Sequence, residues 1–520
     1  MTWPRREGAR IGALVSNAPS IASTPSIRIR TANARSIDPR GDFVLYWMIA
    51  SRRARHSFAL DRAIEHARAL GKPLLVLEPL RVGYPFASDR FHRFVLQGMA
   101  DNAARFAETG VLYHPYVEPE PSAGKGLLAE LAARAAVVVT DDYPAFFLPR
   151  MVKSAAARLP VLLEQVDSIG LLPMGASDRV FTTAYSFRFF LQKNLKEHLA
   201  HRPNPDPLKG LDIPSLAALP KGVAKRWPRA SEALLSGDPA ALAALPIDHS
   251  VPVSHIQGGA AAGEARLREF LKSGLPLYAT DRNDPDSDAA SGLSPYLHFG
   301  HISAHEVFSS LMKREAWRPE QISGVVNGQR EGWWGASPEA EAFLDELITW
   351  RELGIVMCSH REDYRSFDSL PDWALKTLAK HEGDARPTLY TLAELETAST
   401  HDPLWNAAQR QLVTEGRMHN YLRMLWGKKV FEWSRSPREA LETLITLNDK
   451  HAIDGRDPNS YSGILWVFGR YDRAWGPERP IYGKVRYMSS DNTAKKLKLK
   501  GYLARWSGPN GQSAPLNAGE

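Results

Sequence analysis

The fold is decided early, in FVLYWMIASRRARHSFALDRAIEHARALGKPLLVL, which occupies residues 43–77. Two short apolar runs, 43–48 and 74–77, have the length of buried strands. The stretch between them, 57–70, has a helical pattern in which Ser57 is a suitable N-cap and Gly71 follows the last helical residue. This order predicts two parallel strands, because parallel strands need a crossover connection such as a helix.

The same alternation continues to about residue 170. Further strands are expected at 111–113, 137–140 and 161–166, and 89–109 has a helical pattern. Strands that alternate with helices predict a Rossmann-like, doubly wound parallel sheet, here of five strands. The glycine-rich dinucleotide fingerprint is missing and residues 124–126 are interpreted as a turn, so nothing indicates that the sheet binds NAD.

The composition of the chain changes along its 520 residues, which suits two or more domains. We expect a basic, disordered tail over 1–34, although its arginines and serines would also suit a transit peptide. The α/β domain should span 35–190. A linker rich in Pro, Ala and Gly is expected over 191–260, followed by an all-α domain over 261–506 and a flexible C-terminus over 507–520.

The charge and the cysteine content limit the functional classes. The formal net charge is +7, which favours a polyanionic partner without proving one. Cys358 is the only cysteine, so the chain can form no internal disulfide and no cysteine-based zinc cluster. This fits a reducing cytoplasm, and no apolar run is long enough to suggest a membrane helix.

Several of the 14 tryptophans lie at informative intervals in the helical part. Glu346 and Trp350 are four residues apart and should share a helix face. Trp426 and Trp433 are two helical turns apart, with Trp405 and Trp466 on neighbouring segments. Each tryptophan taken alone suits core packing. A carboxylate beside a tryptophan also suits a pocket that stacks an aromatic ligand and hydrogen-bonds its edge.

The sequence also contains residues of two other kinds of site, a metal site and a nucleophilic triad. His298, His301 and His305 have a spacing that could suit a metal, but no carboxylate or cysteine completes the set and Gly300 interrupts the helix, so we expect no metal site. Ser-His-Asp combinations lack a nucleophile-elbow pattern.

Ordered motifs from about residue 35 to 505 resemble those of one family. They are Ser291–Ser303 (SGLSPYLHFGHIS), Trp405–Arg410 (WNAAQR), Gly416–Lys429 (GRMHNYLRMLWGKK), Leu447–Lys450 (LNDK), Asp454–Asn459 (DGRDPN) and Gly483–Met488 (GKVRYM). They are similar to the motifs of the photolyase/cryptochrome superfamily, and above all of the class II cyclobutane pyrimidine dimer (CPD) photolyases. The resemblance implies light-driven repair of UV-damaged DNA with non-covalently bound FAD in the helical domain.

The resemblance also implies residue roles. The FAD phosphates would be held by Tyr278, Ser291, Gly292, Leu293, Ser294 and Pro295, with Asn448 near flavin N5 and Asp454 and Arg456 near the ring. Glu346 would hydrogen-bond the flipped dimer, and Trp350 and Trp466 would flank it. Trp426, Trp405 and Trp433 would pass electrons to the flavin. The DNA contacts would be Trp350, Trp466, Met424, Arg473, Arg479, Lys484 and Arg486.

Two segments depart from the family pattern. Arg52–His56 (RRARH) differs from the polar segment expected there, so a second antenna chromophore of deazaflavin or folate type stays open. The segment 316–337, with Trp333 and Trp334, is longer than expected. The chain is expected to be a monomer in the cytoplasm.

Three functions compete with CPD repair. A (6-4) photolyase would place histidines in the pocket, and none stands beside Glu346 or Trp466 in the sequence. A signalling cryptochrome usually has a long C-terminal extension, and few residues follow the basic run 495–500. A catalytically silent module that binds FAD and nucleic acid would not need Glu346, Asn448 and the tryptophans.

Overall fold

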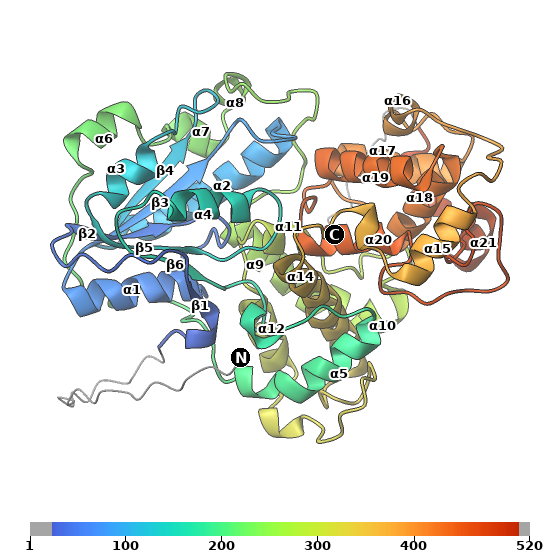
Figure 1. Ribbon diagram of the computed structural model, residues 1–520, viewed down its shortest axis with the longest axis horizontal. Coiled ribbons are helices and arrows are strands. Elements are labelled where there is room, and N and C mark those ends of the chain that lie inside the picture. Colours follow the sequence, from blue (N-terminus) through green and yellow to red (C-terminus); the bar gives the residue numbers. More distant parts are fainter. Residues whose placement is uncertain (1–22, 509–520) are drawn as a thin grey trace, which may run out of the picture.

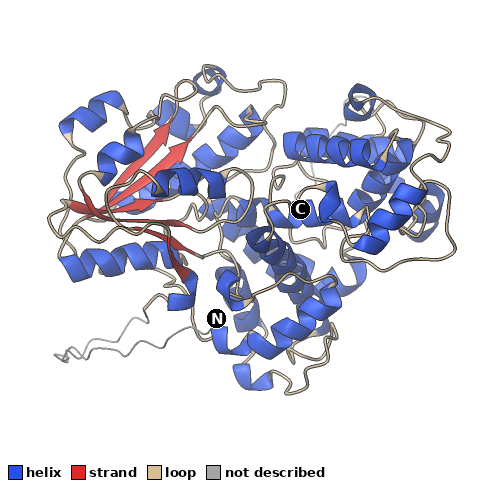
Figure 2. Cartoon of the chain, viewed as in Figure 1, coloured by secondary structure: helices blue, strands red, loops and turns tan. Residues whose placement is uncertain are grey.

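The computed structural model describes residues 23–508, and its α/β domain is built on one six-stranded sheet. The strand order is β1-β6-β5-β2-β3-β4, with β1 antiparallel to β6 and all other neighbours parallel. The strands are β1 (Ile29–Thr31), β2 (Phe43–Trp47), β3 (Leu74–Leu80), β4 (Leu112–Val117), β5 (Ala135–Asp141) and β6 (Leu163–Val166). Helices flank the sheet (Figures 1 and 2), which confirms the Rossmann-like fold.

The sixth strand, β1, corrects the expected count of five and lies inside the segment predicted to be a disordered tail. Ile29 pairs with Val166 of β6. Beside it Arg28 is buried, and its guanidinium donates hydrogen bonds to the carbonyls of Gly170 and Leu171 at 3.1 and 2.7 Å. The basic composition suggested a solvated tail, but this arginine satisfies buried backbone groups. The rest of the predicted tail, 1–22, lies outside the described residues, as does 509–520 of the predicted C-terminus.

Both faces of the sheet are covered, and successive side chains of β2 point to opposite faces. Val44 and Tyr46 pack in a cluster with α1, and Leu45 and Trp47 pack with α3 and α4 on the other face. As expected, Ser57 caps α1 by accepting a hydrogen bond from the N–H of Leu60. The helices of this domain are α1 (Phe58–Leu70), α2 (Asp89–Ala107), α3 (Leu127–Ala132) and α4 (Leu148–Ala156).

The segment predicted as a linker is docked rather than free. It contains three short helices, α6 (Lys221–Arg226), α7 (Glu232–Ser236) and α8 (Pro239–Ala243). Leu235 and Leu242 pack with Val95 and Leu96 of α2, so the segment covers part of the α/β domain. The preceding helix α5 (Ala184–Asn194) already packs with the helical domain.

The remaining chain is helical, as predicted. Its α-helices are α9 (Ala260–Glu269), α10 (Tyr278–Asp281), α11 (Ser294–His298), α12 (Ala304–Arg314), α13 (Pro338–Leu344), α14 (Arg351–His360), α15 (Asp372–Lys380), α16 (Leu392–Glu396), α17 (Pro403–Glu415), α18 (Asn420–Trp433), α19 (Pro437–His451), α20 (Pro458–Trp466), α21 (Ser490–Lys496) and α22 (Lys500–Trp506). None of the described helices has the length and apolar character needed to cross a membrane.

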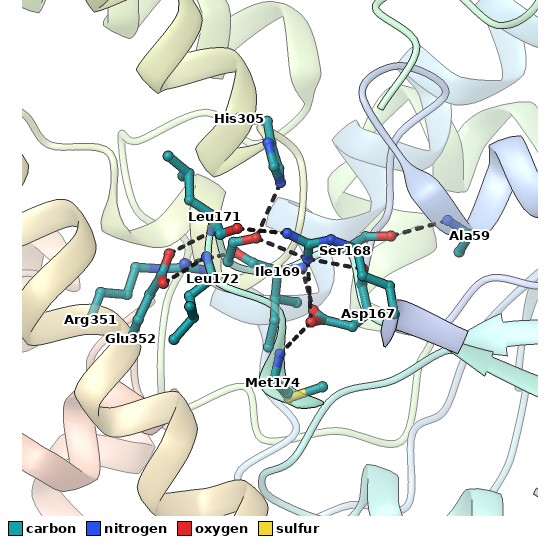
Figure 3. A network of polar contacts seen from close by, with 12 residues as sticks. Ala59, Asp167, Ser168, Ile169, Leu171, Leu172, Met174, His305, Arg351 and Glu352 are labelled. Carbon is teal, nitrogen blue, oxygen red and sulfur yellow. Dashed lines mark hydrogen bonds and ion pairs between the residues drawn. The ribbon is translucent and has the colours of Figure 1, made fainter. Parts of the chain in front are cut away.

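The loop after β6 joins the two domains (Figure 3). Glu352, near the start of α14, accepts hydrogen bonds from the N–H groups of Leu171 and Leu172 at 2.6 and 3.0 Å, and burial raises its pKa to about 7. Arg351 donates to the carbonyl of Ile169 at 2.7 Å. Because α14 follows directly on the turn that carries Glu346 and Trp350, the α/β domain anchors one end of the candidate site.

Candidate active site

Glu346 and Trp350 lie in a π-helical turn, η7 (Asp345–Trp350), between α13 and α14. The sequence predicted a regular helix here, whereas π-helical turns are rare and often occur at functional sites. Both side chains are partly buried. Burial raises the pKa of the Glu346 carboxyl, and the neighbouring Asp345 raises it further. The carboxyl therefore keeps its proton to a higher pH than an exposed glutamate.

Tyr278, predicted to contact the cofactor, is buried on the same side of the domain. Its ring lies 5.4 Å from that of Phe343 in α13, and Arg282 lies 5.5 Å from its ring centroid. Burial raises the pKa of Tyr278, and the charge of Glu346 contributes to this increase. Tyr278 thus packs against α13, the helix that leads into the turn with Glu346.

The predicted phosphate-binding loop is a defined turn. Arg266 of α9 holds it by donating to the carbonyls of Ala290 and Ser291 at 2.6 and 2.8 Å. Gly292 has a φ of +65°, and a Cβ there would lie 3.0 Å from Arg266 Nε, so glycine is favoured at this position. The chain then enters the short helix α11 at Ser294, with Leu293 buried before it.

Asn448, near the end of α19, is buried and has a fixed amide orientation. Its Nδ2 donates to Asp449 Oδ1 at 3.1 Å and to Ser460 Oγ at 2.7 Å. Burial raises the pKa of Asp449. The two donors of Asn448 are used by these residues, so its Oδ1 is left to accept a further hydrogen bond.

Asp454 and Arg456, both predicted to lie near the flavin ring, have different partners in the structure. Asp454 forms an ion pair of 3.3 Å with Arg423 of α18. Arg456 has a φ of +67° and places its guanidinium 3.7 Å from the ring centroid of Phe91 in α2. Arg423 was not predicted, although it belongs to the Gly416–Lys429 motif.

The three predicted electron-transfer tryptophans are buried and connected. Trp405 Nε1 donates to the carbonyl of Trp426 at 3.0 Å, and the rings of Trp405 and Trp433 are 5.5 Å apart. The ring of Tyr390 lies 5.3 Å from Trp433, and its hydroxyl lies 2.6 Å from Nδ1 of the exposed His401. Sequence reasoning missed Tyr390 and His401, because they come from a loop whose position no local pattern reveals.

Cations alternate with aromatic rings around Trp466. Lys428 Nζ lies 4.9 Å from the Trp466 ring centroid, and the Arg486 guanidinium lies 5.7 Å from the same centroid. Arg486 and Arg473 lie 5.0 and 4.3 Å from the ring of Trp475. Burial lowers the pKa of Lys428 to about 7. Lys428 and Trp475 were not among the predicted residues.

The other residues predicted to contact DNA, Arg479, Lys484 and Met424, contact neighbouring side chains of the protein. Arg479 lies 4.8 Å from the ring of Tyr487, and Lys484 lies 3.7 Å from Glu478. Met424 is partly buried against the core that contains Trp426. The structure therefore places Arg486 beside both Trp466 and Trp475, places Arg473 beside Trp475, and leaves Arg479 and Lys484 in separate contacts.

The three histidines considered for a metal point to different places. His298 Nδ1 lies 3.3 Å from Asp457, His301 Nδ1 accepts from the N–H of Gly259, and His305 Nε2 lies 3.1 Å from the carbonyl of Gly170. Within residues 23–508, no group of three or more metal-ligating side chains is assembled.

A cavity of about 430 Å³ lies between the sheet and the helical domain. Its aromatic wall includes Trp47, Tyr84 and Phe299, and Arg456 also lines it. Arg52, from the segment that departs from the family pattern, faces this cavity and is ion-paired with the buried Glu78 at 2.9 Å. One residue of the departing segment, Arg52, therefore lines a cavity.

The chemistry of the donor set fits a flavin dinucleotide. The Asn448 oxygen can accept a hydrogen bond from a heteroaromatic N–H because its amide hydrogens are used by Asp449 and Ser460, and Arg266 holds the turn around Ser291. His419 Nδ1 is buried without a partner among the described residues, and its pKa is lowered to about 4 by burial. These polar groups suit a ligand that combines a planar ring with phosphates.

Comparisons with known proteins identify relatives of this chain. No protein-family model matches the chain. A deoxyribodipyrimidine photo-lyase of Methanothermobacter thermautotrophicus is 36% identical over 482 residues, which cover 92% of this chain and 98% of that protein. A deoxyribodipyrimidine photo-lyase of Oryza sativa subsp. japonica is 35% identical, covering 95% of this chain and 93% of that protein.

Solved structures show the same fold. A bacterial class III photolyase from Agrobacterium tumefaciens superposes with a TM-score of 0.63 at 16% identity, covering 91% of this chain and 87% of the other. A cryptochrome from Synechocystis sp. PCC6803 superposes with a TM-score of 0.60 at 15% identity, covering 89% and 88%. By its sequence relatives, and in agreement with its two-domain fold, this chain belongs to the deoxyribodipyrimidine photo-lyases of the photolyase/cryptochrome superfamily.

Proposed function

We propose that this protein repairs cyclobutane pyrimidine dimers in DNA in a light-dependent reaction, as a class II photolyase. The observation that carries the proposal is the η7 turn, in which a carboxyl with a raised pKa and a tryptophan lie together beside Tyr278. Its support is the similarity to several deoxyribodipyrimidine photo-lyases over most of the chain. The class II assignment rests on the six sequence motifs.

In this proposal, positively charged side chains of the protein bind the DNA phosphates. Arg473 and Arg486 stand beside Trp466 and Trp475, so phosphates and bases can be bound by neighbouring groups. A dimer pairs and stacks poorly with the rest of the duplex, and its extrusion into a pocket therefore costs less than that of normal bases.

In the pocket, Trp350 and Trp466 flank the dimer and the Glu346 carboxyl donates a hydrogen bond to its carbonyl edge. Because burial and Asp345 raise the pKa of the Glu346 carboxyl, the protonated form persists to a higher pH than in an exposed glutamate, and that form can donate where an ionised carboxylate cannot. FAD, when bound, supplies the light-driven electron for splitting the dimer. Asn448 accepts a hydrogen bond from the cofactor, and the buried tryptophans 426, 405 and 433 connect its site to the surface near Tyr390.

The aromatic cavity beside the sheet is proposed as the site of a second, light-harvesting chromophore. Its volume of about 430 Å³ suits a planar heterocycle, and Arg52 and Arg456 could face an anionic edge. The test is to extract small molecules from the purified protein and measure their absorption, with Trp47→Ala as the variant that should lose the second chromophore and keep FAD. Retention of the second chromophore by that variant would contradict the proposed site.

Illumination of damaged DNA separates the candidate functions. Purified protein with pre-reduced FAD should restore CPD-containing DNA in blue light and not in the dark, and should leave (6-4) lesions unchanged. Repair of (6-4) lesions alone would identify a (6-4) photolyase. Binding of FAD without repair of either lesion would favour the photoreceptor or the silent binding module.

A further inference from the structure

A buried ion pair fixes the N-terminal end of η7, which begins at Asp345. Arg188 of α5 donates to Asp345 through two parallel hydrogen bonds, Nε to Oδ1 at 2.8 Å and Nη2 to Oδ2 at 3.1 Å. Each side chain is only 9% exposed. Arg330 lies 3.7 Å from the same carboxylate but is mostly exposed. A two-point arginine–carboxylate contact fixes both distance and orientation.

The segment 316–337, longer than the sequence led us to expect, holds this ion pair in place. Arg188 Nη1 donates to the carbonyl of Gly328 at 3.1 Å. One helical turn further along α5, Gln192 accepts from the N–H groups of Asn327 and Gly328 at 3.1 and 2.7 Å and donates to the carbonyl of Gln329 at 2.9 Å. The segment is therefore bound to α5 around Arg188.

Aromatic packing secures the other part of the segment. Trp317 Nε1 donates to the carbonyl of Trp334, and the rings of Trp333 and Trp334 are 4.7 Å apart. Glu341 of α13 accepts from the N–H of Gly335 at 2.9 Å. The space left between α5, this segment and η7 is about 20 Å³, enough for no more than about one water molecule.

Glu346 is the residue next to Asp345, so whatever fixes Asp345 also fixes the backbone of Glu346. The charged groups that influence the Glu346 carboxyl are Asp345, which raises its pKa, and Arg282, Arg330 and Arg188, which lower it. Without Arg188, Asp345 would be a buried carboxylate lacking its main partner, which is costly enough to displace it.

We propose that the Arg188–Asp345 pair, held by segment 316–337, is a positioning pair that sets the orientation of Glu346 toward the lesion. This inference rests on the proposed function and explains the long segment as a support for the lesion-binding turn. Arg188 acts through Glu346 and does not itself contact the dimer.

A double-mutant cycle tests the proposal. Arg188→Gln should lower the quantum yield of CPD repair by pre-reduced enzyme about three- to tenfold, with lesion affinity changed less than about twofold. In the Glu346→Ala background, the same substitution should cost less than about twofold, because the side chain it orients is absent. Full, independent losses in both backgrounds would overturn the proposal.

Hydrogen exchange supplies a readout that needs no light. The amides of 345–350 should exchange faster in Arg188→Gln than in the wild type, and unchanged exchange there would contradict the positioning role. If Arg188→Gln does not fold, Arg188→Lys takes its place in the same cycle, since it keeps the charge and loses the two-point contact. The matched control is Arg134→Gln, which removes an exposed pair with Asp42 in the α/β domain and should change neither readout.

The outcome also distinguishes this inference from the proposed function. A wild-type protein that repairs no CPD in light contradicts the proposed function. A wild-type protein that repairs CPD, together with an Arg188→Gln variant that repairs equally well, contradicts only the positioning pair.

Discussion

The two sides of the proposed lesion site are built differently. The η7 side, with Glu346 and Trp350, is fixed at one end by the buried Arg188–Asp345 pair and at the other by the hydrogen bonds of Glu352 to the loop after β6. The Trp466 side carries arginines that reach solvent beside aromatic rings. Rigid, buried support suits chemistry that depends on precise orientation. Cations beside aromatic rings suit affinity for a flexible polyanion.

The largest expected effect is on the η7 side. Glu346→Ala should lower the quantum yield of CPD repair about ten- to hundredfold, because a hydrogen bond to a charged intermediate contributes roughly 1.5–3 kcal/mol. Its effect on DNA affinity should be much smaller. Quantum yield and lesion affinity measured on the same preparations check this, and wild-type yield at saturating enzyme would make Glu346 an ordinary helix carboxylate.

The stacking tryptophan of the same turn should behave differently. Trp350→Ala should weaken lesion binding by about 1–3 kcal/mol, the usual contribution of a base–aromatic stack. Titration of CPD-containing and undamaged DNA measures this loss, which should appear only with the lesion. An equal loss with both DNAs would move Trp350 from the lesion to the general DNA surface.

A smaller effect is expected on the Trp466 side. Arg486→Gln should weaken binding of damaged and undamaged DNA alike and reduce the slope of log affinity against log salt by about 1. The control is Arg438→Gln, in an exposed pair with Asp368, which should leave the slope unchanged. A loss confined to damaged DNA would mean that Arg486 acts through Trp466 on the lesion.

The smallest effect on repair is expected for the electron-transfer tryptophans, which belong neither to the η7 side nor to the Trp466 side of the lesion site. Trp426→Phe should block photoreduction of oxidised FAD, because it replaces a readily oxidised indole with a phenyl ring that is much harder to oxidise, while the backbone carbonyl that Trp405 contacts is kept. Repair by enzyme reduced chemically beforehand should be nearly unchanged. Loss of both activities together would mean that Trp426 is structural, since its Nε1 also donates to Gln409.

Local sequence patterns predicted those parts of the fold that depend on short-range spacing. The caps of α1, the alternating strands and the change to helices at about residue 260 all follow from short-range spacing. Strand β1 was missed because a three-residue strand with arginines on either side of Ile29 has no apolar pattern, and it forms only because β6 offers an edge. The docking of the 191–260 segment likewise depends on a surface of α2 that the sequence alone does not reveal.

The site was predicted as a set of residues but not as an arrangement. The sequence and its family resemblance named Glu346, Asn448 and the tryptophans. In the structure, Tyr278 packs on Phe343 of α13, the helix that leads into η7, and Trp405 contacts the Trp426 carbonyl and the Trp433 ring. The motifs gave no sign of the π-helical turn or of Arg188, which is 157 residues from Asp345 in the chain. They also gave no sign that the guanidinium of Arg456 packs on Phe91 of α2.

The pH dependence of repair tests the role of Glu346 most directly. Because burial and Asp345 raise the pKa of Glu346, the protonated donor persists above the usual range of a carboxyl and is lost as the pH rises through the raised pKa. The quantum yield of the wild type should therefore fall as the pH rises, while Glu346→Gln, whose amide is always a donor, should give a yield that does not fall. A Glu346→Gln variant that loses yield over the same pH range as the wild type would contradict the account.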